Sequence, residues 1–260
     1  MKFVIHIFLL GFILLVFARA GYPDKERNKY IGFDKNLYVS KFEVSNAEYN
    51  EFLSELKSSG NSYLFEEHLY DSTQWRAKFP TSFIPIASLY HTHSAYSNFP
   101  VVNIKASSAA AYCVWLTNKY NSQPHKNHKQ TLFRLPTEAE WIRIVHSGVS
   151  DTTFSVAESK TSKFRRRAPY ANLKRIDSTG NKVLYNLDGS LLTAKVGSYS
   201  SNNSGIFDLI GNVSELTSDG AIKGGNWDSF IEDCMPLKQQ FYQLPDPRVG
   251  FRIVMEVIEN

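Results

Sequence analysis

Arg134-Leu135-Pro136-Thr137-Glu138-Ala139-Glu140-Trp141 is the stretch of sequence that decides most about this fold. Thr137 and Glu140 have the spacing of a capping box, in which a hydroxyl and a carboxylate satisfy the first free backbone N–H groups of a helix. We therefore expect a helix to begin here. Ser45 and Glu48 have the same spacing and predict a second helix upstream.

Short strand-like and long irregular segments surround these two helices. Residues 37–44, 99–104 and 249–257 are rich in β-branched and aromatic side chains, as is typical of strands. Residues 58–98 and 147–204 keep no helical or strand period, so we expect loops there, the first attached to the body by its aromatic side chains. The pattern predicts one α+β domain with long loops and little regular structure.

The first twenty residues differ from the rest. Lys2 precedes an almost unbroken apolar run from Phe3 to Phe17, and Ala18-Arg19-Ala20 offers small residues for cleavage. This is the pattern of a signal peptide, and the run is short for a bilayer span, although an uncleaved anchor is the alternative. We expect an exported protein in the periplasm, the outer envelope or outside the cell. The expected organisation is a signal peptide at 1–20, an irregular lead-in at 21–36 and one domain at 37–260.

Composition excludes several classes of protein. The 260 residues are 43% hydrophobic and 21% charged, which is enough apolar surface for a core and argues against disorder. The formal charge is +4 and the basic residues are scattered, so we expect no nucleic-acid partner. Only Cys113 and Cys234 are present, so the chain is not a disulfide scaffold, and the sequence leaves one bridge between them open.

Several segments, in chain order, resemble the motifs of one family. They are Tyr38–Tyr49, Phe99–Ile104, Ala110–Trp115, Arg134–Trp141, Gly205–Thr217, Lys223–Trp227 and Gly250–Arg252. Together they are similar to the sulfatase-modifying-factor family, whose enzymatic members are formylglycine-generating enzymes. The resemblance implies the formylglycine-generating-enzyme fold, a compact variant of the C-type-lectin-like architecture.

Two segments also resemble a narrower subgroup. Asp71–Arg76 and His93–Pro100 look like an insert in gliding-motility and type IX secretion lipoproteins of the GldJ and GldK type. Those proteins are envelope components of gliding bacteria. No cysteine lies near the expected cleavage point, so the lipoprotein role itself is not implied.

The resemblance also implies a copper site, which this chain does not complete. The enzymes oxidise a sulfatase cysteine with molecular oxygen at a copper ion held by two thiolates, four and nine residues after the second glycine of a G-G motif. Counted from Gly225, these positions hold Ser229 and Cys234. Two soft thiolates suit Cu(I), whereas a hydroxyl is a poor ligand for it. We therefore expect no copper, and a degenerate site without the known oxidase activity.

Calcium is the expected metal. Two carboxylates and two backbone carbonyls recur at short spacing along one segment, and such hard oxygen ligands suit Ca²⁺. This first set is Asp208, Gly211, Val213 and Glu215. The resemblance implies a second set, Asn172, Leu173, Asp188 and Ser190. Both would cross-link loops; the alternative is that these carboxylates only cap turns.

The remaining charged motif residues are expected to be structural. Arg134, Glu138, Glu140 and Arg252 stand among apolar neighbours, and we interpret them as ion pairs and caps rather than acid–base catalysts. Cys113, within an alanine-rich helix, is expected to be a small buried group. The resemblance places its usual cysteine partner at Ile253, so that bridge is missing.

An intact framework with an incomplete copper pair favours one functional hypothesis. It is an exported, non-catalytic module that binds or scaffolds an envelope protein or glycan, with membrane contact only through an uncleaved signal. A gliding or secretion role would fit the subgroup resemblance. One alternative is an oxidoreductase of the formylglycine-generating type that acts on a protein thiol through a modified site. Another is a lectin-like module that binds glycans.

Overall fold

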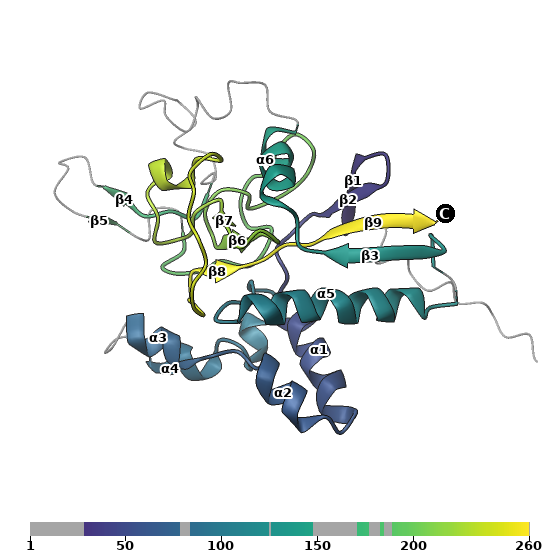
Figure 1. The fold of residues 1–260 in the computed structure, drawn as a ribbon. Coiled ribbons are helices and arrows are strands. Elements are labelled where there is room, and N and C mark those ends of the chain that lie inside the picture. Colours follow the sequence, from purple (N-terminus) through teal and green to yellow (C-terminus); the bar gives the residue numbers. More distant parts are fainter. Residues whose placement is uncertain are drawn as a thin grey trace, which may run out of the picture.

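A four-stranded antiparallel sheet forms the centre of the molecule (Figure 1). The computed structural model describes residues 29–78, 84–124, 126–147, 171–176, 183–184 and 189–259. The sheet has the order β1-β2-β9-β3. Its strands are β1 (Tyr30–Asp34), β2 (Leu37–Ser40), β3 (Gln130–Arg134) and β9 (Val254–Glu259).

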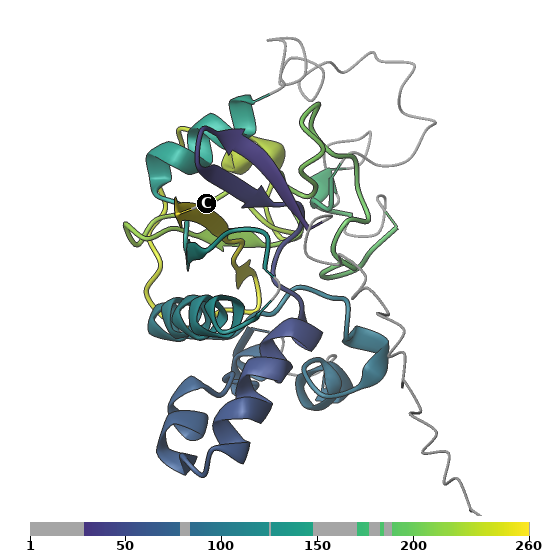
Figure 2. The same ribbon diagram turned by 90° about the vertical axis from the view of Figure 1, so that its right-hand side faces the viewer.

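Helices α5 (Ala106–Asn121) and α6 (Glu138–His146) lie on opposite faces of this sheet. The helices that precede α5 in the chain are α1 (Asn46–Ser58), α2 (Ser62–His68), α3 (Thr73–Lys78), α4 (Ile84–Leu89) and the 3₁₀ turn η1 (Ser94–Tyr96). Side chains alternate across a strand, so neighbours on β9 face different layers. Met255 packs with α5, whereas Val254 packs with Trp141 of α6. Figures 1 and 2 show α1 and α2 at one end of the molecule and α6 at the other.

Both capping boxes predicted from the sequence are confirmed. Ser45 and Glu48 cap α1, and Thr137 and Glu140 cap α6, each with the two reciprocal bonds to the backbone. Local spacing was enough to find them because the bonds join residues only three positions apart.

The predicted irregular regions contain more regular structure than expected. β1 lies inside the expected lead-in and pairs with β2 through a turn at Asn36. The expected loop at 58–98 contains α2, α3, α4 and η1. These helices have six or seven residues at most, too few for a helical period to show. The aromatic attachment is confirmed: Trp75 and Tyr90 are buried there.

Two other sequence predictions were wrong. Residues 99–104 form no strand beyond an isolated bridge between Ser45 and Pro100. Asn103 has a left-handed backbone, φ +59°, which interrupts an extended run at this residue. For the alanine-rich helix that contains Cys113, the sequence predicts a cap at Ser107 or Ser108. α5 instead begins at Ala106, after Lys105, whose side chain makes no cap.

A second, smaller sheet has the order β7-β6-β8. Its strands are β6 (Ser214–Leu216), β7 (Ile222–Lys223) and β8 (Val249–Gly250). Three further elements belong to neither sheet: the strand pair β4 (Arg175–Ile176) and β5 (Val183–Leu184), and the 3₁₀ turn η3 (Ile231–Cys234). The expected final strand is split into β8 and β9, and residues 251–253 carry the chain from one sheet to the other. None of the helices in the described ranges is long and apolar enough to cross a membrane.

Candidate functional site

The junction between the two sheets holds a buried ion pair. Arg252 has no exposed surface and forks onto Glu215, with its Nε 2.6 Å from Oε2. The same Oε2 accepts the Trp141 Nε1–H at 2.7 Å. The guanidinium also donates to the carbonyls of Ser40 and Phe207. These contacts tie β2, α6, β6 and the 205–212 loop together, and they confirm the structural interpretation of Arg252.

A second buried carboxylate lies beside this pair with fewer partners. Glu43 is 1% exposed, and its Oε1 accepts the Asn212 Nδ2–H at 2.9 Å. Its Oε2 has no hydrogen-bond partner among the described residues. Burial, and then the nearby charges of Asp208 and Glu215, raise the pKa of Glu43 well above its usual value. The buried site therefore favours the neutral form of this carboxyl more than water does.

Asn212 connects this acidic cluster to its surroundings. Its Oδ1 accepts from the Ala194 N–H at 2.8 Å and from Asn172 Nδ2 at 3.2 Å, while its Nδ2 donates to Glu43. Sequence reasoning missed both Glu43 and Asn212. The available signal was a single carboxylate between the apolar residues Phe42 and Val44.

The first calcium set does not fit these contacts. Both oxygens of Glu215 are held by Arg252, whose charge already neutralises the carboxylate. The Asp208 carboxylate accepts the backbone N–H groups of Gly197 and Tyr199, as a turn cap does. Burial raises the pKa of Asp208 to about 6. Asp208 therefore caps a turn, as the alternative interpretation expects, and Glu215 forms an ion pair. Gly211 and Val213, which lie between Asp208 and Glu215 in the sequence, are buried.

The second calcium set is described only in part. Asp188 lies outside the described residues. Asn172 donates to the Leu192 carbonyl at 2.7 Å, so it runs beside the segment that follows Ser190. Leu173 is buried in a cluster with Ala171 and Cys234.

The degenerate copper pair is built into the packing of a tight loop. Ser229 is 8% exposed, and its Oγ accepts the Asn226 N–H at 3.1 Å. Cys234 is 0% exposed, and its Sγ donates to the Phe230 carbonyl at 3.4 Å. Gly225 supplies the room for this sulfur: at φ +67°, a Cβ on it would lie 2.2 Å from Sγ.

Burial also affects the acidity of this thiol. It raises the pKa of Cys234 to about 12, which disfavours the thiolate form that binds copper or attacks a substrate. One thiol and one hydroxyl, each with a backbone partner, do not fit a Cu(I) ion. Cys113 is likewise buried with a pKa raised to about 12, and neither cysteine is in a disulfide.

The other charged motif residues also form ion pairs. Arg134 lies 2.7 Å from Glu140, the carboxylate that caps α6. Glu138 lies 2.9 Å from the fully buried Nζ of Lys223. The interpretation of these residues as pairs and caps is confirmed.

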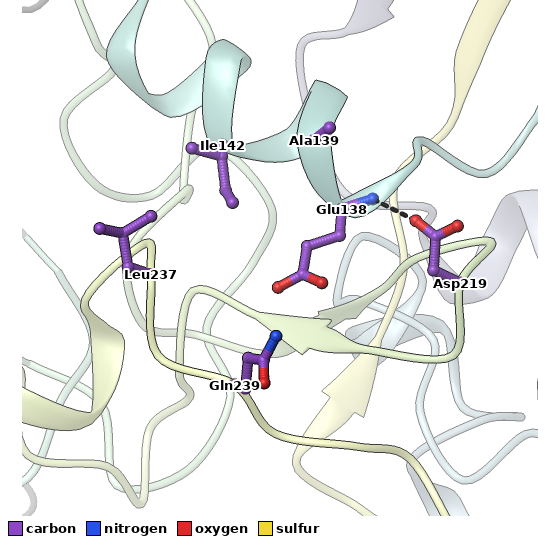
Figure 3. A pocket seen from close by; sticks show the side chains of 6 residues that line it. All are labelled: Glu138, Ala139, Ile142, Asp219, Leu237 and Gln239. Atoms are coloured by element: carbon purple, nitrogen blue, oxygen red, sulfur yellow. Dashed lines mark hydrogen bonds between the residues drawn. The ribbon is translucent and has the colours of Figure 1, made fainter.

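A hollow of about 420 Å³ opens at the start of α6 (Figure 3). Its lining residues are Glu138, Ala139, Ile142, Asp219, Leu237 and Gln239. The Glu138 backbone N–H donates to Asp219 Oδ2 at 2.6 Å, and the Asp219 side chain lies on the opposite side of the hollow from Leu237. Leu237 and Ile142 lie at the other end, which gives the hollow an acidic side and an apolar side.

Comparison with proteins of known sequence gives consistent matches. The formylglycine-generating enzyme of Mus musculus is 27% identical over 205 residues, which are 70% of this chain and 49% of that protein. The enzyme of Streptomyces coelicolor is 30% identical over 129 residues, 47% of this chain and 32% of that protein. The chain thus spans about half, or less, of the length of these relatives.

Solved structures share the fold. CarF matches with a TM-score of 0.51 and 17% identity, over 85% of this chain and 86% of CarF. Treponema denticola variable protein 1 matches with a TM-score of 0.52 and 16% identity, over 88% and 91% of the two chains. At this identity the likeness shows the fold alone, and it confirms the expected α+β class.

A family model agrees with the motifs quoted from the sequence. The model of the Sulfatase-modifying factor enzyme 1-like domain matches residues 17–257, which include the segment that forms β1. The match covers the buried junction, the cysteine loop and both sheets except the last two residues of β9. The chain therefore belongs to the sulfatase-modifying-factor family.

Proposed function

We propose that this chain is an exported binding or scaffolding module of the bacterial cell envelope that has lost the oxidase chemistry of its enzymatic relatives. The observation that carries the proposal is the state of the cysteine loop. Ser229 stands at the position of the first thiolate, and Cys234 is buried against Gly225 with its pKa raised to about 12. The framework around the loop is complete, so the domain can fold and present a surface without that chemistry.

The alternatives lack a comparable observation. An oxidoreductase with a modified site would need an accessible thiol, and both cysteines are buried. Glycan binding rests on the lectin-like fold alone, which is a weak reason. Export is proposed from the signal pattern of residues 1–20, and a gliding or secretion role from the similarity of Asp71–Arg76 and His93–Pro100 to the GldJ and GldK type.

A test for oxidation is direct. The purified protein is incubated with Cu(I), oxygen and a C-x-P-x-R peptide, and the aldehyde is sought by mass spectrometry after capture with an aminooxy reagent. We expect no aldehyde above the level of Cys234→Ala, the matched control. Aldehyde that forms with the wild-type chain and is lost in Cys234→Ala would overturn the proposal.

We also propose a structural calcium ion at the second set only. Support comes from Asn172, whose Nδ2 donates to the Leu192 carbonyl at 2.7 Å, two positions after Ser190 of the same set. An ion that binds only the folded state raises the melting temperature. A chelator should lower it in the wild type and in Asp208→Asn, but not in Asp188→Asn. If the chelator leaves the melting temperature of the wild type unchanged, the proposal of a structural calcium ion is wrong.

A further inference from the structure

The hollow at α6 continues into an open sheet edge. Residues 240–242 run antiparallel to β7: Ile222 N–H donates to the Gln240 carbonyl at 2.8 Å, and Tyr242 N–H donates to the Gly220 carbonyl at 3.1 Å. Phe241 lies opposite Ala221 between these two bonds. In such a pair the backbone N–H and C=O of Phe241 point away from β7. The segment therefore presents its own hydrogen-bonding groups at the outer edge of the smaller sheet.

Large apolar side chains are exposed along the same segment. Leu237, Phe241 and Leu244 are 76%, 63% and 72% exposed. Leu237 forms the apolar wall of the hollow together with Ile142. This strand edge has no backbone partner among the described residues. Proteins ordinarily avoid exposed apolar side chains beside such an edge unless a partner covers it.

The charge of the hollow indicates which kind of side chain it can bind. Lys223 already neutralises Glu138. Asp219 is exposed, and one of its oxygens accepts the Glu138 N–H. Its negative charge faces the hollow, and no cationic side chain of the described residues pairs with it. A Lys or Arg side chain fits both sides of the hollow. Its aliphatic stem can pack against Leu237, and its cationic head can pair with Asp219.

We propose that this surface, which we call the α6 edge (Glu138, Ala139, Ile142, Asp219 and residues 237–244), docks an extended segment of a partner protein. The segment adds as a strand next to Phe241 and places a basic side chain, flanked by apolar ones, in the hollow. This inference rests on the proposed function as a binding module and names the chemistry of its partner.

The test uses a defined peptide and the full chain. The probe is acetyl-Val-Arg-Leu-Arg-Val-amide, and its counterpart carries Glu in place of both Arg. Titration into ¹⁵N-labelled protein is followed by NMR. We expect shifts at the amides of 237–243 and of the first turn of α6, and slower hydrogen exchange at Phe241. The Glu peptide should bind at least threefold more weakly.

Two variants and one control locate the contact. Asp219→Asn keeps an acceptor for the Glu138 N–H but removes the charge, and Leu237→Ser removes an exposed side chain. Each should weaken binding of the Arg peptide by at least threefold. Tyr63→Ser removes an equally exposed side chain, 75%, from α2 at the other end of the molecule, and should bind as the wild type does.

Equal binding of both peptides, shifts away from the α6 edge, or no shifts would overturn the inference. None of these results affects the oxidation test. A failure here would leave a non-oxidising module with another docking surface, whereas aldehyde formation would remove the proposed function and leave the peptide result standing.

Discussion

The buried junction and the cysteine loop are both motif regions of the same family, and they are built in opposite ways. At the junction, Arg252 and Glu215 are charged, buried and saturated with partners. In the loop, Ser229 and Cys234 are neutral groups that fill space beside glycine and backbone. The difference teaches that the motifs preserve a scaffold, while the family's chemistry depends on a few side chains that can be replaced without loss of the fold.

The largest expected effect comes from breaking the junction. Arg252→Met leaves Glu215 buried without a cation, so the free energy of unfolding should fall by about 3–5 kcal/mol. Urea denaturation followed by circular dichroism measures it. Arg143→Met is the matched control: its ion pair with Asp34 is exposed, so its loss should cost less than about 1 kcal/mol. Similar losses in the two variants would show that the junction is not the electrostatic centre of the fold.

A smaller loss is expected in the cysteine loop. Gly225→Ala puts a Cβ against the Cys234 sulfur and strains a left-handed backbone, which should destabilise the fold by about 1–3 kcal/mol. Because Cys234→Ala removes the sulfur, the double variant should lose less than the sum of the two single variants. Additive losses would mean that this contact does not determine the packing of the loop.

The pH dependence of stability distinguishes the carboxylates at the junction from one another. Since the pKa of Glu43 is raised in the folded state, the folded chain binds more protons than the unfolded chain above about pH 4.5. Stability should therefore decline as the pH rises through the folded-state pKa of Glu43, and Asp208, with its pKa raised to about 6, adds to the decline between about 4 and 6.

Glu43→Gln keeps the acceptor for Asn212 and removes the ionisation. It should flatten the decline and be more stable than the wild type at pH 8. Glu66→Gln, on the exposed part of α2, should keep the wild-type profile. Denaturant midpoints at a series of pH values provide the measurement, and parallel profiles of Glu43→Gln and wild type would contradict the prediction.

The smallest expected effect is in thiol reactivity. Because both thiols are buried with pKa values raised to about 12, a disulfide reagent at pH 8 should react only after unfolding. Gln239→Cys, which adds a thiol at an exposed position, should react at once and by one equivalent. Rapid modification of Cys234 in the folded wild type would reopen the cysteine loop as a reactive site.

The sequence by itself determined the two capped helices, the family resemblance and the missing thiolate. Each depends on residues that are close together in the chain or on a motif that can be aligned by eye. Ser45 with Glu48, and Ser229 with Cys234 counted from Gly225, are examples.

Only the tertiary structure decided which groups Glu215 and Glu43 contact and which residues come together in the α6 edge. Arg252 meets Glu215 across 37 positions, and Asn212 meets Glu43 across 169, so no local pattern could assign these partners. The carboxylates expected to bind calcium became an ion pair and a turn cap for this reason. A carboxylate acts according to its neighbours in space, and those are set by how the two sheets join.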